Sequence, residues 1–238
     1  MAVFVFGTGV ASVSGGGSEV IVPPPLDPVF ANNDWETIAL VCQANAVPDT
    51  WAVGNSKTMT INGADYLIDI IGKNHDVYSD GTGVAPLTFQ LHDAYLDEYA
   101  MHNINVNNWE LCDMRNVRLP SVMSSMPINV QTSIREINKP TLYGSPVVTK
   151  ITSEKLFFLS EFEVHGGVTY ARGVEGNQYE YYMSGGKKNK TKDGKSDLWW
   201  TRSPRANSEN QFCIVSSTGN PHVESANRPT PMSFAFCF

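Results

Sequence analysis

The chain has 238 residues, of which 42% are hydrophobic and 17% are charged, and its formal net charge is −7. This acidic balance excludes general nucleic-acid binding, which requires a basic surface that displaces counterions. Low charge together with many Gly, Pro, Asn, Ser and Thr residues favours a loop-rich fold with short strands over a helical bundle. No apolar run reaches the length of about 18 residues that a membrane span requires.

The first 32 residues form a distinct segment. An apolar start, residues 3–6, is followed by glycines and then by three prolines at 23–25. Glycine costs backbone entropy and proline removes ladder donors, so the segment is not expected to fold alone. Residues 3–6 are nevertheless too apolar for a solvated tail. We therefore predict an extended N-terminal arm over residues 1–32, which docks on this domain or on a neighbouring copy, and one domain over residues 33–238.

Helix signals lie in the first half of the domain. Asn33 followed by Glu36 matches a capping box at the start of an amphipathic helix. A second helix is predicted over residues 108–117. A third is predicted over residues 128–137, and Pro140 is expected to end it.

Strand signals are short and become more frequent toward the C-terminus. Strand-like runs cover residues 57–61, 64–71, 87–91, 156–159 and 212–215, and residues 178–183 are ambiguous between helix and strand. The first two runs are joined by Asn62-Gly63, the strongest short-range signal for a hairpin. Helices early in the chain and dispersed short strands later predict an α+β domain.

Residues 198–238 have an unusual concentration of aromatic side chains at both ends. WWTRSP occupies residues 199–204 and FAFCF occupies residues 234–238. Each such ring buries roughly 150–250 Å², so we predict that both strings lie in the core and that the chain ends in a sheet. The polar segment 205–228 between them is then held by two buried anchors, as binding loops on rigid scaffolds are.

The polar residues outside this segment form no recognisable catalytic or metal-binding motif. His75-Asp76 and His92-Asp93 are adjacent pairs, whose side chains point to opposite faces of a strand, and we interpret these histidines as surface or structural residues. The carboxylates of Asp76, Asp80, Glu161 and Glu163 match no established calcium loop. We expect Glu161 and Glu163 to bind backbone groups or arginines inside the fold. The sequence therefore predicts no catalytic residue, no metal site and no cofactor.

The cysteines and a group of lysines lead to structural expectations. Cys42, Cys112, Cys213 and Cys237 lie in apolar segments and lack zinc-site spacing, which is typical of buried free thiols. A disulfide between Cys213 and Cys237 is left open. The lysine-rich residues 187–195 are predicted to form a flexible exposed loop, with a polyanion contact as the alternative.

Several strings, in their order and spacing, resemble a known family over residues 33–238. They are WELCDMR at 109–115, LFFLSEFE at 156–163, Glu175-Gly176, WWTRSP, FCIV at 212–215 and FAFCF. Together they resemble an uncharacterised domain that is common in proteins of gut Firmicutes and of their tailed phages. That domain is similar to the C-type-lectin-like superfamily, in the branch shared with formylglycine-generating enzymes and the variable proteins of diversity-generating retroelements.

This resemblance implies a C-type-lectin-like α+β fold with short antiparallel strands, two or three helices and a ligand-binding C-terminal surface. In the diversified relatives, polar positions between the WWxRSP string and the last strand contact the ligand. The corresponding residues here are Arg205, Asn207, Glu209, Asn210, Ser216, Thr218, Asn220, His222, Glu224 and Asn227. The chain departs from these relatives in two ways. It lacks the usual Val-Arg-Pro before its ending, and therefore the buried arginine of that string. It also lacks the close cysteine pair of the formylglycine-generating enzymes.

The expected function follows from the fold, the arm and the start of the chain, which has no basic region or continuous apolar run of a signal peptide. We expect a non-enzymatic virion protein of a tailed phage, made in the host cytoplasm and released by lysis, with a lectin-like domain that recognises a host-surface glycan or protein as part of a tail tip or fibre. Its other expected partners are virion proteins and copies of itself, through residues 1–32. The alternatives are a capsid or tail decoration protein without receptor binding, an oxidoreductase like the formylglycine-generating enzymes, and a bacterial binding module that is cytoplasmic or non-classically exported.

Overall fold

The structure is a computed structural model that describes residues 25–104, 107–144 and 146–238. It contains about 19% helix and 33% strand, with the strands in small antiparallel sheets. The predicted α+β class is therefore confirmed. None of the helices in the described ranges is both long and apolar enough to span a bilayer.

The central sheet joins the two ends of the domain. Its strands are β1 (Ser56–Ile61), β2 (Ala64–Lys73), β3 (Leu87–Leu91) and β11 (Ala235–Cys237), in the order β1-β2-β3-β11. β1 and β2 form the predicted hairpin, because Asn62 and Gly63 adopt the positive φ angles, 50° and 77°, that a tight turn needs. The C-terminal strand pairs with β3, which confirms that the chain ends inside a sheet.

The first helix starts one residue later than the capping box predicts. Helix α1 covers Trp35–Gln43, and its N-cap is Asp34, whose side chain accepts a 2.6 Å hydrogen bond from the N–H of Thr37. Asn33 instead binds the preceding turn, because its side-chain amide donates to the main-chain oxygens of Asp27 and Val29.

Residues 25–32, the last part of the predicted arm, pack on their own domain. A 3-10 turn, η1 (Phe30–Asn32), places Phe30 in the core with 2% exposure, and the indole N–H of Trp51 donates to the main-chain oxygen of Asp27. The remainder of the predicted arm, residues 1–24, lies outside the described residues.

The middle of the chain is helical but broken into short pieces. In place of one helix over 108–117 there are a 3-10 turn, η2 (Trp109–Leu111), and a π-helical segment, η3 (Met114–Arg118), which continues into α2 (Leu119–Met123). Helix α3 covers Ile128–Ser133 and ends before the predicted position.

Pro140, expected to end the third helix, lies inside a strand instead. Strand β4 (Ile137–Tyr143) pairs with β5 (Val148–Glu154) as a two-stranded antiparallel ribbon. Pro140 is tolerated there because the main-chain N–H that proline lacks would point away from β5. No hydrogen bond between the two strands is therefore lost.

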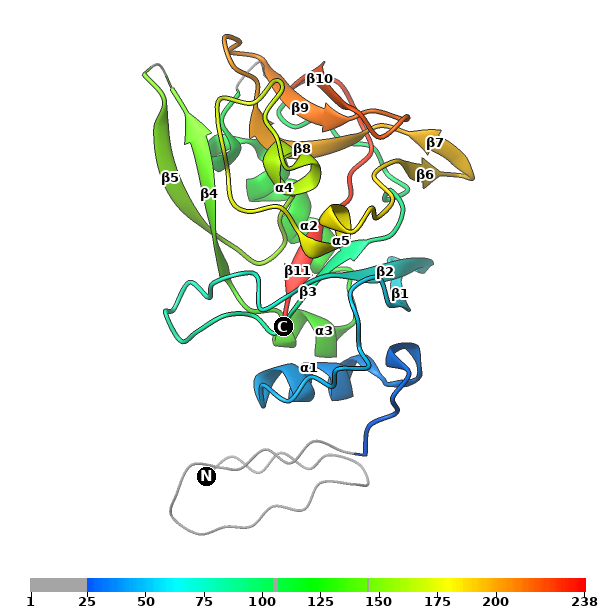
Figure 1. Ribbon diagram of the computed structural model, residues 1–238. Helices are drawn as coiled ribbons and strands as arrows, with labels where there is room; N and C mark the ends of the chain where they lie inside the picture. Colours follow the sequence, from blue (N-terminus) through cyan, green and yellow to red (C-terminus); the bar gives the residue numbers. More distant parts are fainter. Residues whose placement is uncertain (1–24, 105–106, 145) are drawn as a thin grey trace.

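The second half consists of short elements around one further sheet. Residues 156–159, predicted as a strand, make only an isolated bridge between Phe157 and Ala235. The other elements are α4 (Glu161–His165), α5 (Glu180–Met183), β6 (Lys190–Lys192), β7 (Lys195–Asp197), β8 (Trp199–Pro204), β9 (Gln211–Val215) and β10 (Pro221–Ser225). In Figure 1 the β8–β9–β10 sheet lies at the top, at the opposite end of the domain from α1.

The lysine-rich segment is ordered, which contradicts the predicted flexible loop. Residues 190–197 form the β6–β7 hairpin, and Lys190 is 2% exposed. Its ammonium group donates to the main-chain oxygens of Leu91 and His92, at 2.5 and 2.9 Å. Lys190 is therefore a buried hydrogen-bond donor that links the β6–β7 hairpin to the end of β3.

The aromatic strings at the C-terminus are buried as predicted. Trp199 and Trp200 are fully buried and, as neighbours in a strand, point to opposite faces, so that each joins a different hydrophobic cluster. Phe236 and Phe238 pack with Trp35 in the larger cluster. The polar segment is thus tied to the interior at both ends.

Candidate ligand-binding face

The β8–β9–β10 sheet supports the ten polar residues that the resemblance implies in ligand contact. Every residue of β8 is buried, as are residues 212–215 of β9, whereas β10 is the partly exposed edge strand. The polar residues lie in the loop 205–210, in the turn 216–220, and on β10 and the residues that follow it. A buried support with polar loops is the geometry of a binding surface.

The loop 205–210 is held by two side chains from distant parts of the chain. The amide of Asn107 donates to the main-chain oxygens of Arg205, Ser208 and Gln211, at 3.1, 2.6 and 3.3 Å. Arg172 binds both the side-chain oxygen of Asn107, at 3.1 Å, and the main-chain oxygen of Ser208, at 2.9 Å. The loop is therefore fixed through its backbone.

These contacts leave several side chains of the loop free for a ligand. Asn207, Glu209 and Asn210 are exposed, and Asn207 adopts a left-handed φ of 54° that turns the chain. Arg205 is half-buried, because its guanidinium group donates to the side-chain oxygen of Gln211. The loop thus presents amide and carboxylate groups outward and keeps its arginine in a local contact.

The turn 216–220 joins three of the predicted residues in one hydrogen-bonded tip. The Ser216 and Thr218 hydroxyls lie 3.0 Å apart, and the side-chain amide of Asn220 donates to the Thr218 hydroxyl at 3.1 Å. Gly219 has a φ of 82° and lies against the main chain of Asn189 in the segment that leads to β6.

The two loops lie at opposite ends of β9, so the ten residues do not form one patch. The five residues of β9 separate the loop 205–210 from the turn 216–220 by about 17 Å. Asn227 belongs to the first end, where the N–H of Ala226 donates to the main-chain oxygen of Asn210. His222 and Glu224 lie between the two ends, on β10, and Glu224 is engaged with Arg228 in an ion pair.

Tyr170 adds an aromatic ring that sequence reasoning missed. Its ring centroid lies 6.3 Å from that of His222, and the two ring planes are inclined by 29°. Its main-chain oxygen accepts a 2.7 Å hydrogen bond from the N–H of Ala206, next to Asn207. We call Tyr170, His222 and Asn207 the aromatic patch. The only sequence signal for it is a tyrosine in a glycine-rich loop.

Hydrogen bonds fix the backbone at Tyr170 and the ring of His222. Buried Glu161 accepts the N–H groups of Tyr170, at 3.0 Å, and of Ala171, at 2.7 Å. On the other side, His222 Nδ1 accepts the N–H of Val223 at 2.8 Å. In the neutral imidazole the proton then lies on Nε2, which is available as a donor to a ligand.

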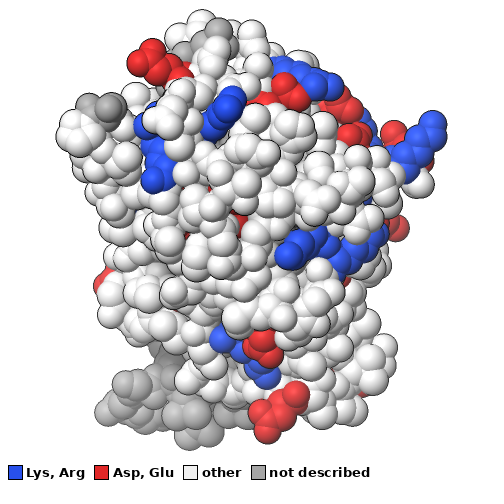
Figure 2. Space-filling model, turned by 45° about the horizontal axis from the view of Figure 1, so that its top comes forward, with Lys and Arg blue, Asp and Glu red and all other residues white. Residues whose placement is uncertain are grey.

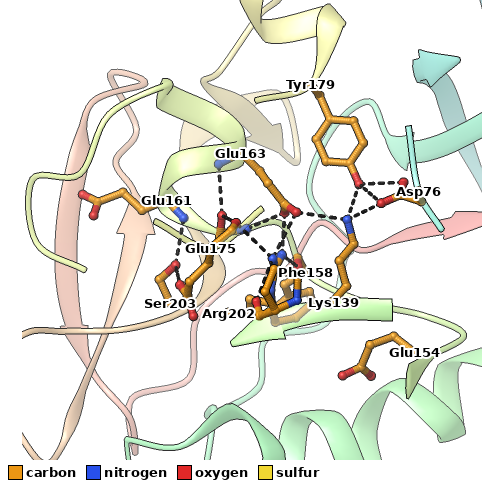
Figure 3. A network of polar contacts seen from close by, with 12 residues as sticks. Asp76, Lys139, Glu154, Phe158, Glu161, Glu163, Glu175, Tyr179, Arg202 and Ser203 are labelled. Atoms are coloured by element: carbon orange, nitrogen blue, oxygen red, sulfur yellow. Dashed lines mark hydrogen bonds and ion pairs between the residues drawn. The ribbon is translucent and has the colours of Figure 1, made fainter. Parts of the chain in front are cut away.

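A buried polar network supports β8 from inside the domain (Figure 3). Arg202 of β8 forms a two-pronged ion pair with Glu163, with Nη1–Oε2 and Nη2–Oε1 distances of 2.5 and 3.0 Å. Glu163 also completes a capping box with Ser160 at the start of α4. Burial alone would raise the pKa of Glu163, but the charges of Arg202 and Lys139 outweigh it and keep the pKa below its usual value.

The network continues from Glu163 through Lys139 to Asp76. The Lys139 ammonium group lies 3.0 Å from Glu163 Oε1 and 2.5 Å from Asp76 Oδ1, and it also contacts the Tyr179 hydroxyl at 2.6 Å. Asp76 accepts further bonds from Tyr179 and from Thr88. Burial raises the pKa of Asp76, but Lys139, His75 and the hydrogen bond from Thr88 together lower it below its usual value, so the carboxylate stays ionised.

Glu175 is the member of the network with the opposite pKa shift. One oxygen accepts the N–H of Leu142 at 2.8 Å, and the other contacts the Ser203 hydroxyl. Burial raises the pKa of Glu175 to about 7, against the effect of the nearby Arg202 charge. The Ser203 hydroxyl donates to this carboxyl group, which is therefore satisfied without a full counter-charge.

The network cannot reach a substrate, because its charged side chains are at most 3% exposed. The expectation that Glu161 and Glu163 bind backbone groups or arginines is confirmed. Among residues 25–104, 107–144 and 146–238, no three His, Cys, Asp or Glu side chains are arranged to hold a metal ion. We interpret the network as internal support for the face.

Two cavities of the domain lie away from the predicted face. One, of about 310 Å³, lies between α1 and α3 and is lined by Tyr78, Arg135 and Phe238. The other, of about 520 Å³, lies between α2 and the end of β5. Neither cavity includes any of the ten predicted residues.

The charges on this part of the surface are few and mixed in sign. Figure 2, in which the top of the domain comes forward, shows Lys and Arg among Asp and Glu, with wide uncharged areas between them. A ligand that is recognised by hydrogen bonds and ring contacts fits such a surface better than a polyanion.

The match to known families covers this face and most of its support. Residues 87–235 match the family described as Domain of unknown function (DUF6273). The chain belongs to this family. The DUF6273 match begins with β3 and ends at the first residue of β11, so that it includes the WELCDMR and WWTRSP strings and the aromatic patch. No curated protein and no solved structure is detectably similar to the chain.

Proposed function

We propose that this protein is a non-enzymatic recognition module of a tailed-phage virion, with a C-type-lectin-like domain that binds a host-surface glycan or protein through the aromatic patch. The observation that carries the proposal is the rigidity of the face. Asn107 and Arg172 fix the loop 205–210, Glu161 fixes Tyr170, and β8 rests on the buried network. A preorganised surface loses less entropy on binding.

The chemistry of the aromatic patch fits a glycan. A sugar ring presents C–H groups on its faces and hydroxyls at its rim, and an aromatic ring beside hydrogen-bonding groups meets both. Tyr170 and His222 offer the rings, the Nε2 of His222 offers a donor, and Asn207 offers both a donor and an acceptor.

Binding to an array of bacterial surface glycans, with intact and variant protein, tests this proposal. Tyr170→Ala and His222→Ala are each expected to weaken binding at least tenfold, while Gln43→Ala, in α1 at the opposite end of the domain, changes it less than twofold. His222 and Gln43 are exposed and Tyr170 is half-buried, so the folding of each variant is checked by thermal unfolding. Equal effects of all three substitutions would contradict the patch, and no binding to any glycan or host-surface protein would favour a decoration protein.

The virion part of the proposal rests on the sequence resemblance and needs its own experiment. Mass spectrometry of particles purified from a lysate is expected to find this protein in stoichiometric amounts. A variant without residues 1–24, which retains the buried Phe30, is expected to fold but to be absent from the particles. Incorporation of that variant would overturn the role of the arm.

The thiols favour binding over the oxidoreductase alternative. Cys213 and Cys237 are both free and buried, with no disulfide between them, and their thiols contact different carboxylates, Glu161 and Asp76. Burial raises the pKa of Cys42 and of Cys112 to about 12. Because the thiolate is the reactive form, we expect no thiol to react with a disulfide reagent until the protein unfolds. Rapid reaction of a thiol pair in the folded protein would revive the oxidoreductase.

A further inference from the structure

Among the residues that the structure describes, no strand pairs with the outer edge of β5. In Figure 1 the β4–β5 ribbon lies at the side of the domain, with β5 as its outermost strand. Val147, Val148 and Ile151 are 51%, 45% and 55% exposed, which is unusual for three aliphatic side chains so close together. Such an edge is a template for pairing with another strand.

The contacts of β4 show which groups of β5 face outward. The N–H of Leu142 donates to Glu175, and the C=O of Pro140 accepts from Arg202, so both residues turn their polar groups away from β5. Their partners in the register, Thr149 and Ile151, therefore form non-hydrogen-bonded pairs with β4 and point their own N–H and C=O groups outward. Neither residue has a backbone partner within the part of the chain that the structure describes.

Two other edge strands, β10 and β1, have main-chain groups that are already bound by side chains. On β10, the N–H of Val223 is bound by the ring of His222, and the N–H of Ser225 is bound by the side chain of Glu224. On β1, the indole N–H of Trp35 covers the main-chain oxygen of Thr58.

The lysine of β5 does not protect its edge. Lysines commonly guard edge strands against pairing, but the ammonium group of Lys150 is engaged in an ion pair with Glu110. At the far end of the strand, Arg115 already binds the main-chain oxygen of Ser153, which limits the free edge to about residues 147–151.

We propose that two copies of this protein pair through β5, antiparallel and around a two-fold axis at Thr149. In this register Thr149 lies opposite Thr149 of the second copy, and Ile151 lies opposite Val147. Ile151 and Val147 then meet each other on both sides of the axis, Val148 lies opposite Lys150, and no like charges lie opposite each other. Thr–Thr pairs and aliphatic pairs stabilise such ladders, and a two-fold contact must be self-complementary in this way.

The pairing joins two ribbons into a four-stranded sheet. Because the strand is short, we expect a weak dimer, with a Kd of about 10 µM to 1 mM. This contact is separate from the aromatic patch, which lies on another sheet, so two copies would present two patches together and gain avidity.

A pair of charged variants tests the register. Sedimentation velocity of the full chain, over about 1 µM to 1 mM, is expected to show a monomer–dimer equilibrium. Thr149→Lys and Thr149→Glu each place like charges opposite at the axis and are expected to weaken dimerisation about tenfold or more. An equimolar mixture of the two variants is expected to restore it, because Lys then faces Glu.

Ile151→Pro provides a second test, since it removes an outward N–H and leaves the ladder with β4 intact. We expect a similar loss of dimer with unchanged secondary structure, measured by circular dichroism.

The proposal is overturned if the intact chain remains monomeric at the highest concentration or if either charged variant dimerises normally. It is also overturned if the mixture fails to restore dimerisation, or if a chain without residues 1–24 loses the dimer.

Discussion

Arg202 and Glu163 form a fully buried, two-pronged ion pair between β8 and α4. The arginine belongs to the WWTRSP string and the glutamate to the LFFLSEFE string, so the pair links two sequence motifs that are 39 residues apart. The arginine also donates to the main-chain oxygen of Phe158 at 2.8 Å. It holds the strand of the candidate face against the helix beneath it.

Replacing Arg202 with Met is expected to destabilise the fold by about 3–5 kcal/mol, because it leaves the Glu163 charge buried with only Lys139 beside it. Urea unfolding measures this loss. The matched control is Arg228→Met, which breaks the exposed pair with Glu224 and is expected to cost at most about 1 kcal/mol. Equal losses in the two variants would contradict a special role for Arg202.

Glu175 is expected to make stability depend on pH. Its folded pKa of about 7 lies above the usual value of 4.5, so the folded state holds a proton that the unfolded state releases. Its contribution is complete below pH 4.5 and is lost as the pH rises toward 7, by about 3 kcal/mol in total. Glu175→Gln keeps both hydrogen bonds and should remove this dependence.

The measurement for Glu175 is a difference between two proteins. His165, whose pKa burial lowers to about 4, contributes the opposite slope over much of the same range. The unfolding free energy of Glu175→Gln minus that of the intact protein cancels this contribution. The difference should rise between pH 4.5 and 7, and a flat difference would show that Glu175 ionises normally.

Gly176 is expected to tolerate no side chain. It has a φ of 88°, and a Cβ atom there would overlap the carboxylate of Glu163. Gly185 has a similar φ of 86° but open space around it. Gly185→Ala should therefore cost about 1–2 kcal/mol from backbone strain alone, and Gly176→Ala about 3 kcal/mol or more, since it also displaces Glu163. Thermal unfolding of the two variants measures the difference.

Lys190→Met is expected to destabilise the fold by about 1–3 kcal/mol, because the half-buried main-chain oxygen of His92 loses a donor and that of Leu91 keeps only the Ser233 hydroxyl. Lys195→Met, at an exposed position of the same hairpin, should stay within about 0.5 kcal/mol of the intact protein. Similar unfolding midpoints in urea for both variants would show that Lys190 has no internal role.

Local signals were sufficient for part of this fold. The Asn62-Gly63 hairpin and the buried C-terminus follow from turn chemistry and aromatic content, and both are confirmed. The β4–β5 ribbon could not be predicted, because Pro140 normally argues against a strand. Pro140 fits in β4 because its main-chain groups point away from β5 and its oxygen accepts a hydrogen bond from Arg202. That arginine lies 62 residues away along the chain.

The candidate site could be predicted only in outline. The polar segment follows from the aromatic anchors on either side, but the division of its residues between two ends depends on the length of β9. Tyr170, Asn107 and Arg172 were missed because their roles arise from contacts with the loop 205–210, which lies 36 or more residues away along the chain. No local pattern carries that information.

Asn107 and Arg172 bind the loop 205–210 through its main-chain oxygens, and this has an evolutionary consequence. Every residue type supplies the same carbonyl, so the path of the loop 205–210 does not depend on the side chains at Glu209 or Asn210. Those two positions can accumulate substitutions without refolding the domain. Relatives of this chain could therefore vary the chemistry of this exposed loop while they inherit the same backbone path.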